Sequence, residues 1–293
     1  MLTEEDCRLI LFSIIEPGDN FWTNEVHNLG AQVVLDLLLS KKYYPQSKQF
    51  LEISNLATQA NLSKLHESLN SVNASFISPR DIDRPAGLND LSNPPIGLVI
   101  QGDRQVLEDI NHSISIVGSR KPTNYGIEVT KKLILKAMQA KYLVVSGGAI
   151  GIDTTAHISC LSFAGKTVAV LAGGFSQPYP MENRRLFSEI AKTGLLISEV
   201  LPSISSRPNR FLIRNRLIAA LSCATIVVEA EFVSGSIRTA REAAEIFRPV
   251  FAIPGPITSE LSQGCHRLIS ERIADIATSF EEILELITPI QIR

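Results

Sequence analysis

The sequence lacks the marks of a secreted, membrane or metal-binding protein. Its four cysteines are far apart in 293 residues and form no Cys-x-x-Cys pair, so we expect reduced, mostly buried thiols and neither a disulfide framework nor a metal site. No apolar run approaches the ~20 residues that a transmembrane helix needs. The N-terminus is acidic, whereas a signal peptide begins with basic residues. These absences predict a cytoplasmic globular protein with no membrane contact.

Several cofactor and catalytic fingerprints are also missing. The chain has no Gly-x-x-x-x-Gly-Lys-Ser/Thr loop, which argues against P-loop ATP hydrolysis, and no Gly-x-Gly-x-x-Gly, which weakens a dinucleotide interpretation. Ser146 does not stand in a Gly-x-Ser-x-Gly elbow. His157 lies one helical turn past Asp153, which could orient it, although a structural histidine is the favoured interpretation. We therefore expect no catalytic residues and no cofactor.

The charges that are present are unevenly distributed. The whole chain has a formal net charge of −2, but residues 112–216 hold 14 Lys+Arg against 5 Asp+Glu, a net charge of +9. Residues 1–111 carry −7 and residues 217–293 carry −4. A basic middle in a slightly acidic chain indicates a polyanionic partner. The alternative is that long helices expose their lysines to solvent.

The hydrophobic pattern changes about a third of the way along the chain. Apolar residues recur at helical spacing up to about residue 75, which predicts a small all-α domain over residues 1–78. A stretch rich in Pro, Asp and Asn over residues 79–93 predicts a linker or an extended lead-in to the following domain. Over residues 94–288, short Val/Ile-rich runs alternate with helical segments. This alternation predicts an α/β domain with a mostly parallel sheet and helices on both faces.

Small and basic residues follow several of the predicted strands. Ligands of parallel sheets bind at the carboxyl ends of the strands, where glycine allows close approach and serine, arginine and backbone N–H groups bond phosphate oxygens. For any single loop the alternative is ordinary turn chemistry. The predicted phosphate contacts, with Arg120 the strongest candidate, are Gly118, Ser119, Arg120, Lys121, Ser146, Gly147, Gly148, Ser234 and Gly235.

A basic loop over residues 205–216 adds four arginines and one aromatic ring. Such a loop suits single-stranded nucleic acid, because arginines follow the backbone and bases stack on aromatic rings. We expect Arg207, Arg210, Phe211 and Arg214 to extend the binding track. Phe211 could instead anchor the core, and Arg214 and Arg216 could pair with Glu199 or Glu229. Asn183 belongs to the same predicted site. We expect Asn183 and Asp153 to hold the loops of the site more than to contact DNA, and for Asp153 the reason is that a carboxylate repels phosphate.

In order and spacing, these motifs resemble the DprA/Smf family, the DNA-processing proteins of bacterial natural transformation. The resemblance covers roughly residues 94–275. The chain departs from the family pattern at Leu212, Phe247 and His266, where proline, glycine and asparagine are usual. The matching pieces are Pro94-Pro95 to Gly102-Asp103, Val117 to Arg120, Tyr125-Gly126, Ser146 to Asp153, Ala156-His157, Tyr179-Pro180 with Asn183, Arg214 to Arg216, Val228 to Ala230, Ser234 to Ser236, Thr239-Ala240 and Pro254-Gly255.

The resemblance implies a Rossmann-like domain preceded by a sterile-alpha-motif-like domain. It implies a non-enzymatic, homodimeric protein that binds single-stranded DNA, protects incoming DNA and helps to load RecA recombinase. Because the sequence ends at Arg293, we expect no C-terminal winged-helix domain of the kind many relatives carry. The rival interpretation is a nucleotide phosphoribohydrolase with a similar sheet, which would need a Pro-Gly-Gly-x-Gly-Thr-x-x-Glu motif that this chain lacks.

Overall fold

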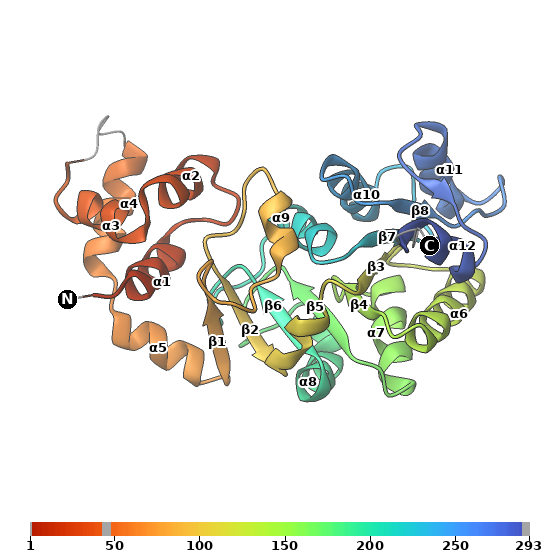
Figure 1. The fold of residues 1–293 in the computed structure, drawn as a ribbon, viewed down its shortest axis with the longest axis horizontal. Coiled ribbons are helices and arrows are strands. Elements are labelled where there is room, and N and C mark those ends of the chain that lie inside the picture. Colours follow the sequence, from red (N-terminus) through yellow and green to blue (C-terminus); the bar gives the residue numbers. More distant parts are fainter. Residues whose placement is uncertain (1, 43–47, 289–293) are drawn as a thin grey trace, which may run out of the picture.

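The computed structural model describes residues 2–42 and 48–288. Its first helices gather into a bundle at one end of the molecule (Figure 1). Side-chain caps at Thr3, Asp19 and Asn61 begin α1, α2 and α5, because each cap accepts hydrogen bonds from N–H groups that a first helical turn leaves without partners. The helices of the bundle are α1 (Glu4–Ile14), α2 (Asn20–Leu29), α3 (Ala31–Leu39), α4 (Lys48–Gln59) and α5 (Leu62–Asn70).

The rest of the described chain contains a nine-stranded sheet and the helices that cover it. The strand order is β1-β2-β6-β5-β4-β3-β7-β8-β9. Neighbouring strands from β6 to β9 are parallel, while β2 runs antiparallel to both β1 and β6. The strands are β1 (Ala74–Ile77), β2 (Leu98–Gly102), β3 (Ser113–Val117), β4 (Leu143–Ser146), β5 (Thr167–Leu171), β6 (Leu195–Ser198), β7 (Ala224–Val227), β8 (Val250–Ala252) and β9 (Asp275–Ile276).

Helices cover both faces of the sheet, which confirms the predicted Rossmann-like architecture. In β5, Val168 and Val170 face one side and Ala169 and Leu171 the other, and all four are buried. Burial on both faces explains why this strand reads as one continuous apolar run. Helices α9 (Pro208–Ala220), α10 (Gly235–Glu245) and α11 (Gln263–Ser270) cover one face, and α6 (Asn124–Gln139), α7 (Ile152–Ser162), α8 (Arg184–Thr193) and α12 (Phe280–Ile287) the other.

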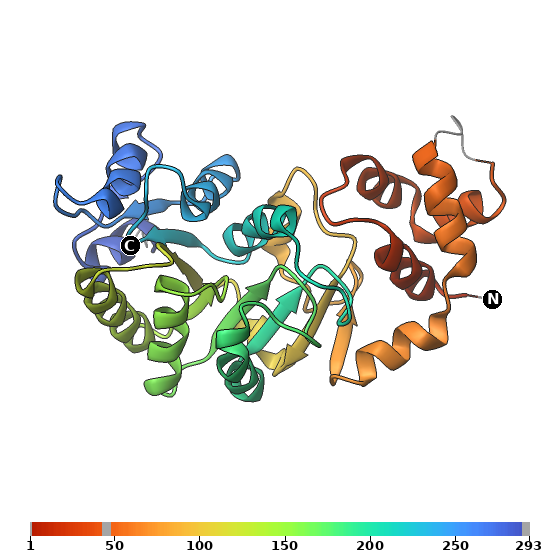
Figure 2. The same ribbon diagram turned by 180° about the vertical axis from the view of Figure 1, so that it is seen from behind.

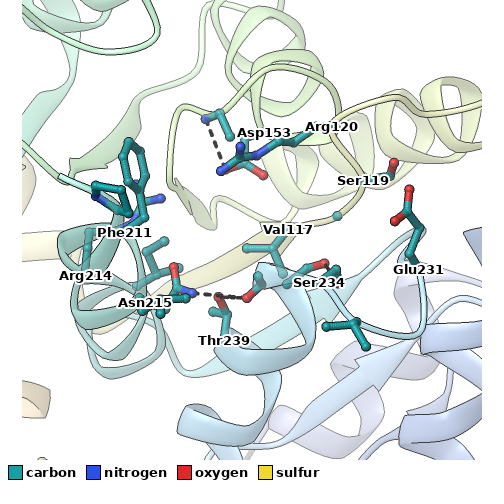
Figure 3. A pocket seen from close by; sticks show the side chains of 18 of the residues that line it. Val117, Ser119, Arg120, Asp153, Phe211, Arg214, Asn215, Glu231, Ser234 and Thr239 are labelled. Atoms are coloured by element: carbon teal, nitrogen blue, oxygen red, sulfur yellow. Dashed lines mark hydrogen bonds between the residues drawn. The ribbon is translucent and has the colours of Figure 1, made fainter. Parts of the chain in front are cut away.

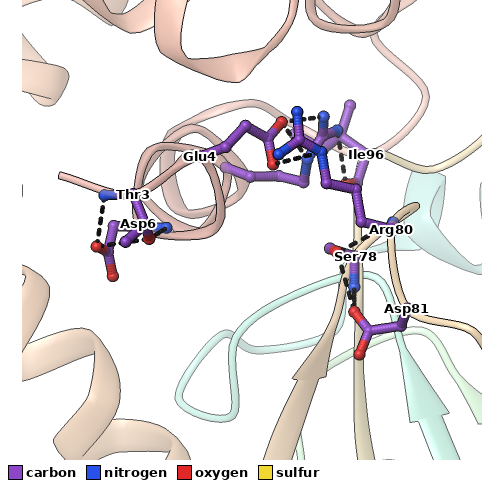
Figure 4. Close-up of polar contacts among 8 residues, drawn as sticks. Thr3, Glu4, Asp6, Ser78, Arg80, Asp81 and Ile96 are labelled. Atoms are coloured by element: carbon purple, nitrogen blue, oxygen red, sulfur yellow. Dashed lines mark hydrogen bonds and ion pairs between the residues drawn. The ribbon is translucent and has the colours of Figure 1, made fainter.

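The bundle packs beside the β1 end of the sheet in both views (Figure 1, Figure 2). Apolar side chains of the bundle and of the sheet form one continuous cluster, in which the rings of Phe12 and Phe76 lie 5.2 Å apart. Polar contacts support this packing: Arg8 Nη1 donates to Ile96 O at 3.2 Å, and Arg80 Nε lies 3.5 Å from Glu4 Oε2 (Figure 4). The bundle and the sheet therefore share a core.

One strand departs from the pattern read in the sequence. The sequence did not predict β1, which follows a turn at Asn73 with a φ of 51° and pairs with β2. Its four residues are too few for alternation to distinguish them from the preceding helical pattern. Residues 79–93 connect the bundle to β2 while packing on the sheet, since Leu88 and Leu91 lie in the core. No helix in the described ranges is long and apolar enough to cross a membrane.

Candidate nucleic-acid interface

A cavity of about 570 Å³ opens at the carboxyl end of β3 (Figure 3). The strand order changes direction here, because β4, β5 and β6 lie on one side of β3 and β7 and β8 on the other. Open α/β sheets bind ligands at this kind of position, where the connections to neighbouring strands diverge. The loop after β3, the first turns of α9 and the start of α10 line the cavity.

The loop after β3 is held tightly against the start of α7. A Cβ atom on Gly118 would lie 2.7 Å from Ile152 Cγ1, so the close approach requires glycine. Ile152 N donates to Ser119 O at 3.1 Å, and Lys121 N donates to the Ser119 hydroxyl at 3.0 Å. These contacts fix the backbone on both sides of Arg120. In the described part of the chain Arg120 is exposed and forms no ion pair, so its charge can reach a ligand.

The Ser146-Gly147-Gly148 segment lies behind this loop and is buried. Asp153 Oδ2 accepts hydrogen bonds from Gly147 N at 3.1 Å and from Ala149 N at 3.3 Å, so these N–H groups serve the fold. Burial raises the pKa of the Asp153 carboxyl, and the nearby guanidinium of Arg214 partly opposes this shift. Ser146 donates its hydroxyl to Ile116 O at 2.7 Å. Ser146, Gly147 and Gly148 thus support the loop after β3 and do not line the large cavity.

Asn183 has a similar supporting position. Its side-chain amide is buried and donates to Gly148 O at 2.9 Å and to the Thr154 hydroxyl at 2.7 Å. These bonds join the start of α8 to the glycine loop and to α7. Asn183 therefore holds the loops of the site together.

Arg214 places a buried positive charge beside the cavity. Its guanidinium donates to Gly147 O at 2.5 Å and to Val170 O, and it occupies the space that a Cβ atom on Gly147 would need, 2.7 Å from its Cζ. Among the described residues its Nε has no hydrogen-bond partner. Burial lowers the pKa of Arg214 to about 10, opposed by the neighbouring Asp153 carboxyl. A buried guanidinium at a cavity wall favours an anionic ligand.

Phe211 presents an aromatic surface between two cavities. Its ring lies 5.9 Å from Arg120 Cζ and 6.0 Å from Arg214 Cζ, and the Tyr179 ring meets it edge-on with centroids 5.4 Å apart. Phe211 and Arg120 line both the large cavity and a neighbouring one of about 280 Å³. Ile150, Tyr179 and apolar atoms of nearby residues line the smaller cavity. Phe211 is half-buried, so part of the ring can contact a ligand.

The start of α10 forms the opposite wall of the large cavity. Ser234 is the N-cap of this helix, and its hydroxyl lies 2.9 Å from that of Ser236. Gly235 O accepts from Asn215 Nδ2 at 3.1 Å and from the Thr239 hydroxyl at 3.3 Å (Figure 3). A helix N-terminus carries partial positive charge and favours anions. Hydroxyls, N–H groups and arginine thus face one another across the cavity.

Comparison with known proteins identifies the family. The family model for DNA recombination-mediator protein A matches residues 75–288. The chain belongs to this family. The resemblance drawn from the sequence motifs is thereby confirmed.

Solved structures of this family have the same fold. DNA processing protein A from Streptococcus pneumoniae is 30% identical, with a TM-score of 0.82 over 97% of this chain and 98% of that one. DNA processing protein A from Helicobacter pylori, described for its single-stranded DNA binding mode, is 29% identical, with a TM-score of 0.66 over 73% of this chain and 94% of that one.

A DprA protein from Mycobacterium tuberculosis is 41% identical over 70% of this chain. The chain spans about half of that relative, 51% of its length.

Within the DNA recombination-mediator fold, the predicted site residues differ in how they relate to the two cavities. Seven of them line the large cavity: Gly118, Ser119, Arg120, Phe211, Arg214, Ser234 and Gly235. Lys121 and Gly147 line the smaller cavity, and Arg207 is exposed at the N-cap of α9. Ser146, Gly148 and Asn183 are buried.

Arg210 does not line the large cavity. Its guanidinium forms a two-point ion pair with Glu16, at 2.6 Å to Oε1 and 2.7 Å to Oε2, and also donates to Ser205 O at 2.7 Å. Arg216 is likewise occupied, because it pairs with Glu199 at 2.5 and 2.7 Å. Sequence reasoning left this pairing open as an alternative, and for Arg216 it is the one observed.

The cavity also contains residues that the sequence-based site omitted. Tyr179, Asn215, Ser236 and Thr239 line it, and Glu231 stands exposed at its rim. The first four belong to motifs shared with the DNA recombination-mediator family, so the resemblance contained the signal. Charge and composition could not have identified these four residues, since none of them carries a charge. In the described residues no group of three His, Cys, Asp or Glu side chains could hold a metal ion.

Proposed function

We propose that this chain binds single-stranded DNA, with the phosphate backbone crossing the large cavity and Arg120 as its principal contact. The observation that carries the proposal is the placement of Arg120. It is exposed and free of ion pairs in the described structure, its guanidinium lies over the Phe211 ring, and it lines a cavity together with hydroxyls and a helix N-terminus. Cations beside an aromatic ring suit single-stranded nucleic acid. The relative from Helicobacter pylori, described as binding single-stranded DNA, supports the same ligand.

Membership of the family supports a more specific proposal. We propose that bound DNA is protected and that the protein helps to load RecA recombinase during natural transformation, acting as a cytoplasmic homodimer and without a catalytic step. We further propose that residues 1–78 form a helical domain that ends in β1 of the sheet, 79–93 a connection and 94–288 the DNA-binding domain. The absence of the phosphoribohydrolase motif disfavours the rival enzyme, so no nucleobase release from a nucleoside monophosphate is expected.

The experiment is fluorescence anisotropy with a labelled oligo-dT. Arg120→Glu is expected to abolish binding, because it puts a negative charge where a phosphate would lie. Lys131→Glu is the matched control, since it makes the same charge change at an exposed position of α6. Both variants should keep the thermal stability of the wild type. Equal affinity of Arg120→Glu and wild type would refute the proposed site, and a wild type that does not bind oligo-dT would refute the function.

A further inference from the structure

The loop between α1 and α2 packs against α9, the helix that carries Phe211 and Arg214. Glu16 begins this loop and forms the two-point ion pair with Arg210, whose side chain is only 7% exposed. A Cβ atom on Gly18 would lie 3.1 Å from Ile213 Cγ2, so the loop backbone touches the helix. Pro17 shares a small cavity wall with Ile213 and with the ends of β5 and β6. The bundle therefore contacts α9 through both charge and packing.

Arg210 also fixes the segment that leads into α9. Its Nη1 donates to Ser205 O, two residues before Arg207. That segment is packed from its other side, because Gly174 N donates to Ile204 O at 2.7 Å and a Cβ atom on Gly173 would lie 2.6 Å from Ser206 N. One guanidinium thus joins the bundle, the arginine loop and the first turn of α9. Hydrogen bonds to charged groups are stronger than those between neutral groups, so this guanidinium stabilises the local arrangement.

Two residues that line the cavity come just after Arg210 on α9. Phe211 is the next residue in the chain, and Arg214 lies one helical turn further on. A shift of the first turn of α9 would therefore move the aromatic ring away from Arg120 and change the cavity wall. Glu16 also stands within electrostatic reach of Arg207, since the pKa of Glu16 is lowered by its hydrogen bond with Arg210 and, to a smaller extent, by Arg207.

We infer that Glu16 is a positioning residue for DNA binding: through Arg210 it lets the helical bundle hold α9 and the arginine loop in the binding geometry. The inference rests on the proposed function of the cavity. It gives the helical bundle a role in binding although none of the bundle's described residues lines the large cavity. It also reassigns Arg210, which the sequence places among the DNA contacts, to the support of that site.

The direction in which Glu16→Gln changes the affinity for DNA distinguishes a positioning role from a purely electrostatic one. Removing a carboxylate near a polyanion should by charge alone strengthen binding. If Glu16 positions α9, Glu16→Gln should weaken oligo-dT binding by about fivefold, within the range that mutations without ligand contact produce. The slope of log Kd against log salt should stay at the wild-type value, because no phosphate contact is lost. Glu281→Gln, which removes the partner of Lys136 between α12 and α6, is the control and should leave affinity unchanged.

A double-mutant cycle and hydrogen exchange complete the test. Arg210→Gln should weaken binding at least as much as Glu16→Gln, because it also removes the bond to Ser205 O, and the double variant should bind no more weakly than Arg210→Gln alone, because both substitutions break the same ion pair. In Glu16→Gln, amide hydrogen exchange should accelerate in the first turn of α9 and not in α10. Unchanged exchange in α9 overturns the inference whether or not the protein binds DNA. Unchanged or tighter binding by Glu16→Gln, or additive losses in the cycle, also overturns it while leaving the proposed function standing.

Discussion

Gly151→Ala tests how the loop that carries Arg120 is held against the start of α7. Gly151 has a φ of 96°, a backbone conformation that residues with a side chain rarely adopt. A Cβ atom there would meet the carbonyl oxygen of Ser119 and lie 2.8 Å from both Cα and C of Arg120. These are backbone atoms, so no side-chain rotation can relieve the contact. Alanine must therefore push the Arg120 loop away from α7.

The expected magnitude has two parts. Holding a residue other than glycine in a disfavoured backbone conformation costs ~1–3 kcal/mol, and overpacking costs a further ~1–3 kcal/mol. We expect a total loss in the free energy of unfolding of about 3 kcal/mol and a fall in Tm of roughly 6–10 °C. Displacing Arg120 should also weaken oligo-dT binding about tenfold, which corresponds to the loss of one charge-assisted hydrogen bond.

Gly30→Ala supplies the matched control for this substitution. Gly30 has a φ of 85°, yet nothing lies within 4 Å of its Cβ position. Alanine there should cost only the backbone strain, ~1–2 kcal/mol, and should leave DNA binding unchanged. Urea denaturation and fluorescence anisotropy measure both effects. Equal destabilisation by the two variants, or full DNA affinity in Gly151→Ala, would show that the contact between the loops does not hold Arg120.

Three further outcomes test other parts of the structure. Phe247 has a φ of 59° and a 94% exposed side chain, so Phe247→Gly should raise the free energy of unfolding in urea by ~0.5–1 kcal/mol, the strain relieved less the entropy that glycine adds to the unfolded chain. Glu229 is buried and accepts from Thr123 N at 2.9 Å and from its hydroxyl at 2.6 Å at the start of α6, so Glu229→Gln should lower Tm through a loss of ~1–2 kcal/mol. Burial, and to a smaller extent the charge of Arg214, lowers the pKa of His157 from 6.5 to about 3. The contribution of His157 to stability is therefore fully present above pH 6.5. The free energy of unfolding should fall by ~1.4 kcal/mol for each pH unit as the pH is lowered from 6.5 to 3, because the unfolded chain binds the proton and the folded one does not. His157→Gln should flatten that part of the stability profile measured by urea denaturation, and an unchanged profile would contradict the assignment.

The alternation of apolar runs and helices was enough to predict the sheet, because buried parallel strands read as continuous Val/Ile segments. It was also enough to bring Arg120 and Ser234 to the same edge, since carboxyl ends of parallel strands meet there. Phe211, for which a core position was the alternative, proves half-buried and lines both cavities.

Side-chain partners far apart in the sequence were beyond prediction. Arg210 and Arg214 are four residues apart on one helix, yet Arg210 meets a carboxylate 194 positions away while Arg214 turns toward Gly147. The choice depends on how the helical bundle docks, and no local pattern encodes that. By contrast, the N–H groups of Gly147 and Ala149 are bound to Asp153, which lies only six and four positions away and which the sequence analysis expected to hold the loops.

The most direct test of the central claim is the salt dependence of oligo-dT binding by wild type and Arg120→Gln. Each phosphate neutralised on a single strand contributes ~0.7 to the slope of log Kd against log salt. If Arg120 binds a backbone phosphate in the cavity, Arg120→Gln should bind more weakly and its slope should be smaller than that of the wild type by about 0.7. Equal affinity and equal slope for the two proteins would contradict the account.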